Sequence, residues 1–427
     1  MARRLGTVLL VLGVFVLVYS TADYMLAAVI DPMRRDGLIP GSEATWRFYA
    51  GLLKTVPGLV GVAMTFLWGV LADTIGRPRL ILLLGAVMGA SLAAVSAATS
   101  YYYLLAAFVV FGVARTGIGP VIYAFIPDLV PPEKRGIGYA AYYTPSVLGF
   151  IAGLLLGVAL YWRTAYLSAA ALSAATVLLL YALTRGVRVG EAEHQEAGDA
   201  VYRLREALRS AMSPTVVLMM AQIIPWTIPW GFITVFAVDY ITTRWGVPRL
   251  TAALVLAVAA LSIALGHVVG GLLADRRVQR GDILGRVKVS AAGIAVGYVA
   301  MLGMLTYPYP YGDTSLAALL PPTLLAATGL MFTTFAYPNL SSIISDCVPP
   351  RHRGTVFAIY NVLNTAGWAL GPALYGLLVS RLAAGQEISR ALMEAAVMLE
   401  SLWLVSLAAW LLAARYYPRD RLRYAEA

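Results

Sequence analysis

The chain has 427 residues, of which 60% are hydrophobic and only 13% are charged, and its formal net charge is +10. Soluble domains carry about 25% charged residues, so this composition excludes an ordinary soluble enzyme or binding module and indicates a membrane protein. The single cysteine, Cys347, excludes an internal disulfide framework and a metal cluster built from several cysteines.

Long apolar stretches follow one another along the whole chain. A helix that crosses a bilayer needs about 20 mostly apolar residues. Twelve stretches meet this need, at residues 5–30, 45–71, 80–98, 101–126, 137–160, 164–184, 214–240, 250–274, 284–306, 318–345, 355–380 and 395–414. All are expected to be helices, because lipid offers no partner for an unpaired backbone group. The sequence therefore predicts an all-α, multi-pass protein of the cell membrane with twelve transmembrane helices.

One long polar stretch follows the sixth apolar stretch. It divides the chain into a predicted N-terminal six-helix bundle at 1–184, a cytoplasmic linker at 185–213 and a C-terminal six-helix bundle at 214–427. Lysine and arginine are concentrated in alternate loops, so the positive-inside rule predicts that both termini are cytoplasmic. This topology, with contact to anionic lipid headgroups, explains the basic net charge without a nucleic-acid partner.

Two short motifs occur once in each half. The string GVLAD at Gly69–Asp73 returns as GLLAD at Gly271–Asp275, and PDLVPPEKRG returns as SDCVPPRHRG. The second match continues into the span that follows it, with two aligned glycine pairs: Gly149 with Gly367, and Gly153 with Gly371. The two halves are therefore predicted to be pseudo-symmetric copies.

The first motif and the residues after it carry groups suited to a closing contact. Gly69 lets two helices approach closely, and Gly76 permits a tight reversal. Asp73 is expected near the start of the third helix, where a carboxylate can accept backbone N–H bonds, and Arg77 offers five donors. We expect these groups to close the cytoplasmic side and to release when the halves move. The alternative is a simple turn that obeys the positive-inside rule.

With both motifs duplicated, the chain resembles the major facilitator superfamily over nearly its whole length. G-x-L-A-D follows the second and eighth spans, and D-x-x-P-x-x-x-R-G follows the fourth and tenth. The resemblance implies secondary transport by alternating access, with a site near the midplane between two halves that rock against each other. It also implies the remaining members of the cytoplasmic gate: Asp128, Arg135, Asp275, Asp346 and Arg353.

Three charges fall deep inside predicted spans of the first half, and a fourth, Arg47, lies near the start of the second span. A charge at mid-bilayer costs about 2.5–3.5 kcal/mol, so each one requires a partner or a function. Asp23 and Lys54 lie about 27 Å and about 22 Å from the inner ends of their helices, which predicts a pair. Asp23 is then either the proton acceptor of transport or only the counter-charge of Lys54. Arg115, near the midplane, is expected to bind an anionic solute group, to pair with deprotonated Asp23, or to pair with another helix.

Two acidic residues lie inside predicted spans of the second half, and the sequence assigns neither of them a role in transport. Asp239 is expected near the outer boundary of the seventh span, where water makes a charge inexpensive. Glu400 is expected in the outer third of the last span, and its function stays open.

Polar and aromatic residues recur on one face of the seventh span. Gln222, Trp226 and Trp230 follow at i, i+4 and i+8, and Pro225 and Pro229 interrupt the backbone hydrogen bonds, as in helices that bind solutes. Equivalent groups are expected in the fifth and eleventh spans: Tyr142, Tyr143, Asn361, Asn364 and Trp368. Aromatic rings with amides suit a small organic solute, although each ring alone also suits a bundle core or a membrane interface.

These observations predict a secondary active transporter of a small organic solute, coupled to H⁺ through Asp23. It is expected to act as a monomer in contact with membrane lipids, without a cofactor or metal. No P-loop or paired catalytic constellation is evident, so we do not expect an enzyme. One alternative is efflux of drugs or lipophilic cations by proton antiport, and another is a membrane sensor that keeps the fold without transporting. The sequence leaves open the solute, the direction of transport and the choice among symport, antiport and uniport.

Overall fold

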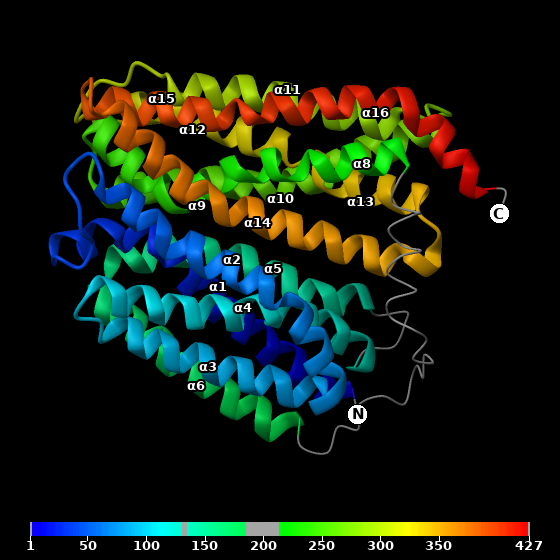
Figure 1. Cartoon of the computed structure of the whole chain (residues 1–427), viewed down its shortest axis with the longest axis horizontal. Coiled ribbons are helices and arrows are strands. Elements are labelled where there is room, and N and C mark those ends of the chain that lie inside the picture. The colour runs from blue at the N-terminus through cyan, green and yellow to red at the C-terminus, as the bar shows by residue number, and fades with distance from the viewer. Residues whose placement is uncertain (1, 130–134, 185–212, 426–427) are drawn as a thin grey trace. The chain divides into compact units, whose positions relative to one another are not determined.

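Figure 1 shows the computed structural model, which describes residues 2–129, 135–184 and 213–425. The regular elements of this described part are all helices. Eleven helical segments in it are long and apolar enough to cross a membrane, and a shorter apolar helix covers Thr144–Ala159. The predicted all-α membrane fold is therefore confirmed. The predicted linker lies almost entirely outside the described residues.

The chain divides into two compact units. Unit 1 comprises Met1–Gln195 together with two short pieces from later in the chain, Thr234–Asp239 and Pro372–Ser380. Unit 2 comprises Glu196–Ile233, Tyr240–Gly371 and Arg381–Ala427. The boundaries that the sequence suggests for its two bundles, at 184 and 214, remain a prediction.

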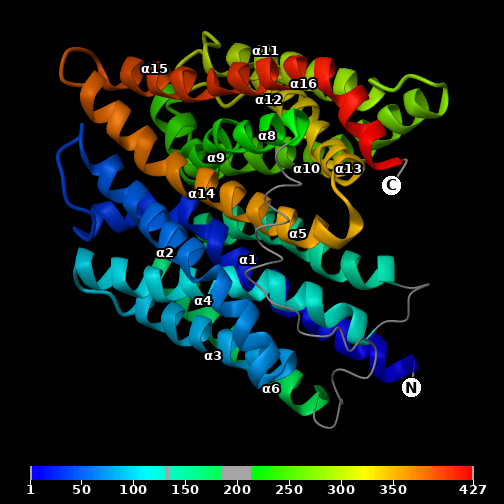
Figure 2. The ribbon, with the colours of Figure 1, turned by 45° about the vertical axis from the view of Figure 1, so that its right-hand side comes forward.

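The first part of the chain supplies long, mostly uninterrupted helices to unit 1: α1 (Ala2–Arg35), α2 (Trp46–Ile75), α3 (Arg77–Ser96), α4 (Tyr101–Leu129), α5 (Arg135–Ala159) and α6 (Trp162–Thr184). Helix α1 packs against α5 and α6, and α4 packs against α2 and α3. Figures 1 and 2 show these helices running beside one another. Each of these helices has at least the roughly 20 residues that are needed to cross the hydrocarbon layer.

Unit 2 is built from shorter helices as well as long ones: α8 (Pro214–Ala221), α9 (Ile223–Trp245), α10 (Arg249–Gln279), α11 (Gly285–Leu305), α12 (Leu316–Thr333), α13 (Ala336–Cys347), α14 (Pro350–Leu382), α15 (Ile388–Glu400) and α16 (Leu402–Ala425). Three candidate spans are each made of two consecutive helices, namely α8 with α9, α12 with α13, and α15 with α16. Interrupted spans are therefore a feature of this unit.

The interruption between α8 and α9 has a cause in the sequence. Helix α8 ends at Ala221, and Gln222 separates it from α9. Pro225 has no N–H to donate to the carbonyl of Ala221, and Pro229 repeats the loss one turn later. The predicted break in the backbone hydrogen bonding of this span is therefore present, and it falls where the first proline leaves a carbonyl without its helical donor.

The duplicated glycines make the same kind of contact in both halves of the sequence. A Cβ built on Gly149 or Gly153 would lie 2.5–2.6 Å from atoms of Ser20 or Thr21 in α1. A Cβ on Gly367 would lie 1.9 Å from Thr227 in α9, and one on Gly371 would lie 2.2 Å from the carbonyl oxygen of Ile228. Both glycine pairs therefore let two helix backbones come together, which explains why the repeat extends into the spans.

Gly371→Ala is expected to lower the free energy of unfolding by about 1–3 kcal/mol, because the added methyl group would overlap the α9 backbone. Gly354→Ala, in the same helix α14, is the matched control, since a Cβ there meets nothing within 4 Å. This control should be neutral or more stable by about 0.5–1 kcal/mol. Thermal unfolding of the purified variants checks both values, and equal unfolding temperatures would contradict the packing argument.

The turn between α2 and α3 consists of Gly76, whose φ is +86°. Residues with a side chain rarely adopt such an angle, so this position favours glycine. Helix α2 continues through Ile75, which places Asp73 in its last turn, and α3 begins at Arg77 with a proline in its first turn. The prediction that Asp73 lies near the start of the third helix is therefore wrong, because the reversal takes place after Asp73 and not before it.

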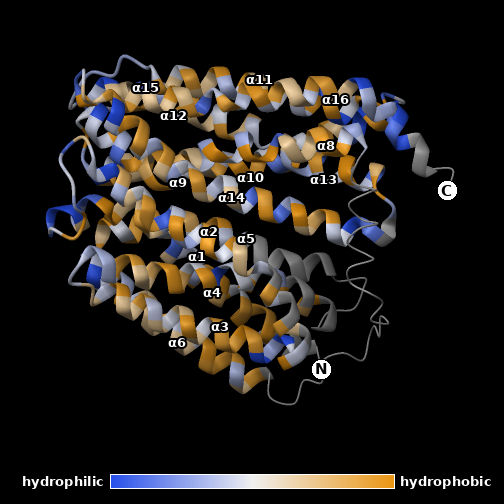
Figure 3. Ribbon diagram, viewed as in Figure 1, coloured by the Kyte–Doolittle hydropathy of each residue, from blue (hydrophilic) through white to orange (hydrophobic). Residues whose placement is uncertain are grey.

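Large apolar side chains remain exposed along several helices of both units: Leu83, Leu172, Leu178, Leu261, Leu265, Leu324 and Leu411. Figure 3 shows hydrophobic residues along the middles of the helices, with hydrophilic residues gathered near their ends. A soluble protein rarely exposes so much apolar surface, whereas lipid accepts it without cost. These side chains therefore form the lipid-facing surface.

Candidate functional site

Unit 1 contains a cluster of three charges, which we call the Asp23 cluster and which consists of Asp23, Lys54 and Arg115. The Lys54 ammonium on α2 donates a hydrogen bond to Oδ1 of Asp23 on α1. The Arg115 guanidinium on α4 lies 2.9 Å from Oδ2 of the same carboxylate. The Asp23 side chain is 6% exposed, while Lys54 and Arg115 are 22% and 32% exposed. The predicted contact between Asp23 and Lys54 is therefore present, and Arg115 makes a second contact with the same carboxylate.

The Asp23 cluster carries two positive formal charges and one negative charge. Lys54 also lies 5.7 Å from the centroid of the Tyr24 ring, an arrangement that further favours the ammonium. A buried carboxylate is stable only with such partners, since an isolated ion in a medium of low polarity is very unfavourable. The arrangement can therefore hold Asp23 ionised, and it presents an excess of positive charge to any group that competes with Asp23.

A second group of predicted residues meets in unit 2. Trp230 on α9 stacks on Trp368 of α14, with ring centroids 5.9 Å apart, and its centroid lies 6.0 Å from that of Trp403 on α16. Trp226 lies 5.3 Å from the ring of Tyr337 on α13. We call these five residues the aromatic cluster. Trp403 and Tyr337 are not among the solute-binding residues predicted from the sequence, because no helical spacing links them to the seventh span.

The amide residues proposed for solute binding differ in their environments. Gln222 is buried, and its Oε1 has no hydrogen-bond partner among the residues that the structure describes. The same holds for Oδ1 of Asn364, a half-buried residue, whereas Asn361 is exposed. The side chains of Tyr142 and Tyr143 lie outside the described part of the chain. Gln222 and Asn364 therefore retain unused acceptors that a solute hydroxyl or amine can satisfy.

The predicted gate residues of unit 2 make contacts within unit 2. Asp275 pairs with Arg286 at 3.0 Å, and Asp346 accepts a hydrogen bond of 2.5 Å from the Tyr417 hydroxyl. Arg353 donates to the carbonyl oxygens of Ser345 and Val348, at 2.7 Å and 3.1 Å. Such bonds satisfy carbonyls at the end of α13.

The remaining gate residues are only partly described. Gly76 forms the turn before α3, and Arg77 begins that helix. The positions of four others on their helices are known, but their contacts lie outside the described part: Gly69, Asp73, Asp128 and Arg135. A gate that forms between the halves remains a prediction.

Arg47 and Asp239 form a buried ion pair in unit 1. Nε of Arg47 lies 2.6 Å from Oδ2 of Asp239, and Nη2 lies 3.0 Å from Oδ1, so the contact is bidentate. The two side chains are only 1% and 6% exposed. The expectation that Asp239 lies in water is therefore wrong. The sequence gives its position along α9 but not the arginine that faces it across 192 positions of the chain.

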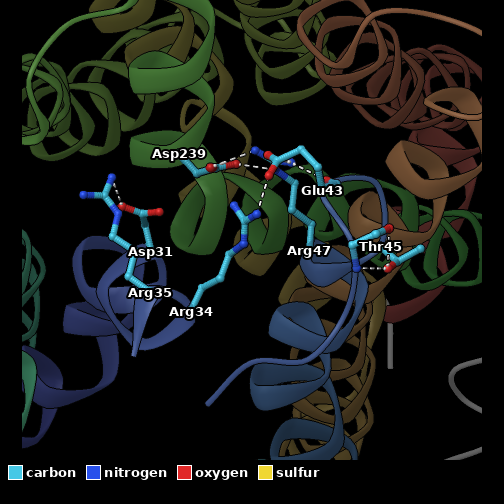
Figure 4. Close-up of polar contacts among 8 residues, drawn as sticks. Asp31, Arg34, Arg35, Glu43, Thr45, Arg47 and Asp239 are labelled. Carbon is cyan, nitrogen blue, oxygen red and sulfur yellow. Dashed lines mark hydrogen bonds and ion pairs between the residues drawn. The ribbon is translucent and has the colours of Figure 1, made fainter. Parts of the chain in front are cut away.

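Further residues extend this pair into a network, drawn in Figure 4. Arg47 donates to the Glu43 carbonyl at 3.2 Å, and Arg34 pairs with the Glu43 carboxylate. The guanidinium carbons of Arg34 and Arg47 lie 4.7 Å and 4.4 Å from the centroid of the Trp46 ring. Burial opposes ionisation of Glu43, but the Arg34 and Arg47 charges prevail and hold the pKa of that carboxyl below its usual value. The network therefore fixes Asp239 and its neighbours within unit 1.

Comparisons with known proteins agree with this architecture. The family model described as Major Facilitator Superfamily matches residues 9–372. The probable sulfoacetate transporter SauU of Cupriavidus necator is 24% identical over 404 residues, covering 89% of each chain. A chloramphenicol resistance protein of Streptomyces lividans is 24% identical and covers 87% of this chain and 93% of its own.

A solved structure has the same fold. The crystal structure of a bacterial homolog to the human lysosomal transporter Spinster, in an inward-facing and occupied conformation, has a TM-score of 0.80. It is 18% identical and covers 97% of this chain and 98% of its own. The chain belongs to the major facilitator superfamily. It is a multi-pass transporter of the cell membrane, and its family indicates a transporter rather than an enzyme.

Proposed function

We propose that the protein transports a small organic anion together with H⁺, and that the Asp23 cluster binds both. The observation that carries this proposal is the contact of one buried carboxylate with two cations. A lipophilic cation would be repelled by their excess positive charge, whereas a carboxylate or sulfonate would be attracted. The charge of the cluster therefore favours an anionic solute over a cationic drug.

The chemistry of the Asp23 cluster couples the two ligands. While Asp23 is ionised, it competes with any anion for Lys54 and Arg115. A proton that binds the Asp23 carboxylate removes this competition, so the two cations become available to the solute anion. Binding of the proton and of the anion then favour each other, which is the thermodynamic requirement of symport. When the anion carries a single charge, the anion and the proton together add no net charge to the site.

One of the two relatives described above is named for an anionic solute. SauU is named for sulfoacetate, an anion, and matches most of the chain. The chloramphenicol resistance protein matches a similar share, so the family resemblance alone does not select the solute. In our proposal the protein acts as a monomer with both termini in the cytoplasm. The duplicated loop motifs serve as its cytoplasmic gate, and the aromatic cluster is a second candidate contact for the solute.

The test is a thermal-shift screen of the detergent-purified protein against small carboxylates and sulfonates, neutral sugars and lipophilic cations, at mildly acidic and mildly alkaline pH. A ligand that binds the folded state raises its apparent stability by mass action. We expect an anion to give the largest shift and the shift to be larger at acidic pH. A lipophilic cation that shifts the protein more at alkaline pH would overturn the proposal in favour of efflux.

Lys54→Met supplies the matched variant for the anion found in the screen. Loss of a hydrogen bond to a charged group, about 1.5–3 kcal/mol, should weaken binding about tenfold to a hundredfold. Lys288→Met is the control, because Lys288 is exposed and pairs with Asp282 at the start of α11. Unchanged affinity in both variants would remove Lys54 from the site. Uptake of the labelled anion into liposomes then distinguishes a transporter from a sensor.

A further inference from the structure

Glu400 is a buried carboxyl group in unit 2 that the Asp23 cluster leaves unexplained. Its side chain is 0% exposed, and it lies at the end of α15. Neither Oε1 nor Oε2 has a hydrogen-bond partner among the residues that the structure describes. Glu400 also takes no part in the ion pairs found among the described residues. An ionised carboxylate in such a place would be extremely unfavourable, whereas the neutral acid is tolerable.

The depth of Glu400 adds to this argument. The last span runs from Ile388 to Arg421, so it begins seven residues earlier than the stretch evident in the sequence. Glu400 lies 12 residues from that start, which corresponds to about 18 Å along a helical span of 34 residues, or about a third of its length. Glu400 therefore lies well inside the last span, and its position in the outer third of that span remains a prediction.

Titratable groups on the elements around α15 are engaged elsewhere. On the same helix, Arg390 pairs with Glu394. From α9, Arg244 bonds to Ser389 and the Tyr240 hydroxyl bonds to the carbonyl of Leu305. From α11, the Tyr298 hydroxyl lies 3.4 Å from Oγ of Ser401. From α16, the first basic residue is Arg415, 15 residues or about 22 Å along the helix.

The interruption beside Glu400 connects it to the interrupted seventh span. Ser401 separates α15 from α16, and its hydroxyl bonds to the Val397 carbonyl at 2.7 Å. In the first turns of α16, Trp403 donates to the Trp226 carbonyl at 2.9 Å, and Ser406 donates to that of Gln222 at 3.2 Å. These bonds tie the backbone of the interrupted seventh span to the first turns of α16, next to Glu400.

We propose that Glu400 is a second proton-binding site, in unit 2, which holds a proton in the conformation described here and releases it to water when the Ser401 interruption opens during transport. The O–H bond of the carboxyl breaks, the proton passes to a water molecule, and the carboxylate remains until it is protonated again. This inference rests on the proposed proton coupling, and it adds a site for the coupling ion that is separate from Asp23.

The first test needs no solute. Infrared spectra of the reconstituted protein are recorded from about pH 5 to about pH 10, the range in which buried ionisable groups titrate in other proteins. We expect a protonated-carboxyl band that titrates in this range, persists in Asp23→Asn and is absent from Glu400→Gln. Glu394→Gln is the control, since Glu394 lies on the same helix and is paired. A band that Glu400→Gln leaves unchanged would overturn the proposal.

The second test separates this proposal from the proposed function. Glutamine has the shape of the neutral acid, so Glu400→Gln should fold with the parent's unfolding temperature. It should exchange labelled solute across the membrane but lose at least tenfold in accumulation driven by a pH gradient, and Glu400→Asp should restore part of it. If Glu400→Gln accumulates solute as well as the parent does, Glu400 stays protonated throughout transport and has only a structural role. This result would overturn the proposal. If the Glu400 band titrates but no solute shows pH-driven accumulation, the proposed function fails and the proton site stands.

Discussion

Asp239→Leu is expected to lower the free energy of unfolding by about 3–5 kcal/mol, because it leaves the buried Arg47 guanidinium without its bidentate partner. The Glu43 carboxylate does not replace it, since that group is 55% exposed and lies 3.6 Å from Nη1 of Arg47. Thermal unfolding of the purified protein measures the loss. Lys288→Ala, which breaks an ion pair at the surface and leaves the other bonds of Asp282 in place, should lower the unfolding temperature much less.

The double variant Arg47→Met with Asp239→Leu tests the cause. Replacing both members of a buried ion pair by apolar residues of similar size is often neutral or stabilising, so the double variant should be more stable than either single variant. A double variant as unstable as the sum of the two singles would show that shape, and not charge, accounts for the loss.

Asp23→Asn is expected to abolish the acid stimulation of solute uptake while exchange of labelled solute continues. The variant cannot take up a proton, and it no longer competes as an anion for Lys54 and Arg115. Solute binding should therefore become independent of pH, and accumulation against a gradient should be lost. Asp23→Leu, which removes the hydrogen bonds as well, should cost about 3–5 kcal/mol of stability for the same reason as Asp239→Leu.

Asp36→Asn is the control for this experiment. Asp36, after α1, accepts hydrogen bonds of 2.6 Å from the Tyr161 hydroxyl and from Trp162 Nε1. These bonds hold the pKa of Asp36 below its usual value. The stability that ionised Asp36 contributes is present above the pKa of the unfolded chain and is lost only as the pH falls through the lower folded value. Asp36 thus stays ionised over the pH range of the experiment, and uptake by Asp36→Asn should keep the parent's pH dependence. If Asp23→Asn still accumulates solute when driven by a proton gradient, Asp23 has only a structural role.

Much of the architecture could be predicted from the sequence because lipid imposes simple rules. Length and apolarity are sufficient to find the spans, and Pro225, which has no N–H to donate, indicates where the seventh span is interrupted. The contact of Asp23 with Lys54 could be predicted as well, since two opposite charges at similar depth on consecutive helices have few other partners.

The remaining contacts depend on which faces of distant helices meet, and spacing along one helix does not contain that information. Asp239 looks like a boundary residue until Arg47 is placed opposite its carboxylate. Trp403 joins Trp230 although 173 positions separate them in the chain. Glu400 has two carboxyl oxygens without a hydrogen-bond partner among the described residues, which its place along one helix does not predict.

The close packing of α1 on α5 determines how a change at Asp23 spreads. Gly153 brings α5 against the backbone of Thr21 and Met25, on either side of Asp23, and Gly157 repeats the contact at Ala28. Two backbones in such contact cannot slide or roll independently, because no flexible side chain between them can absorb the displacement. Any displacement of α1 that follows gain or loss of a proton at Asp23 would therefore carry α5 with it, so spin labels placed on α5 should register the titration of a carboxyl group on α1.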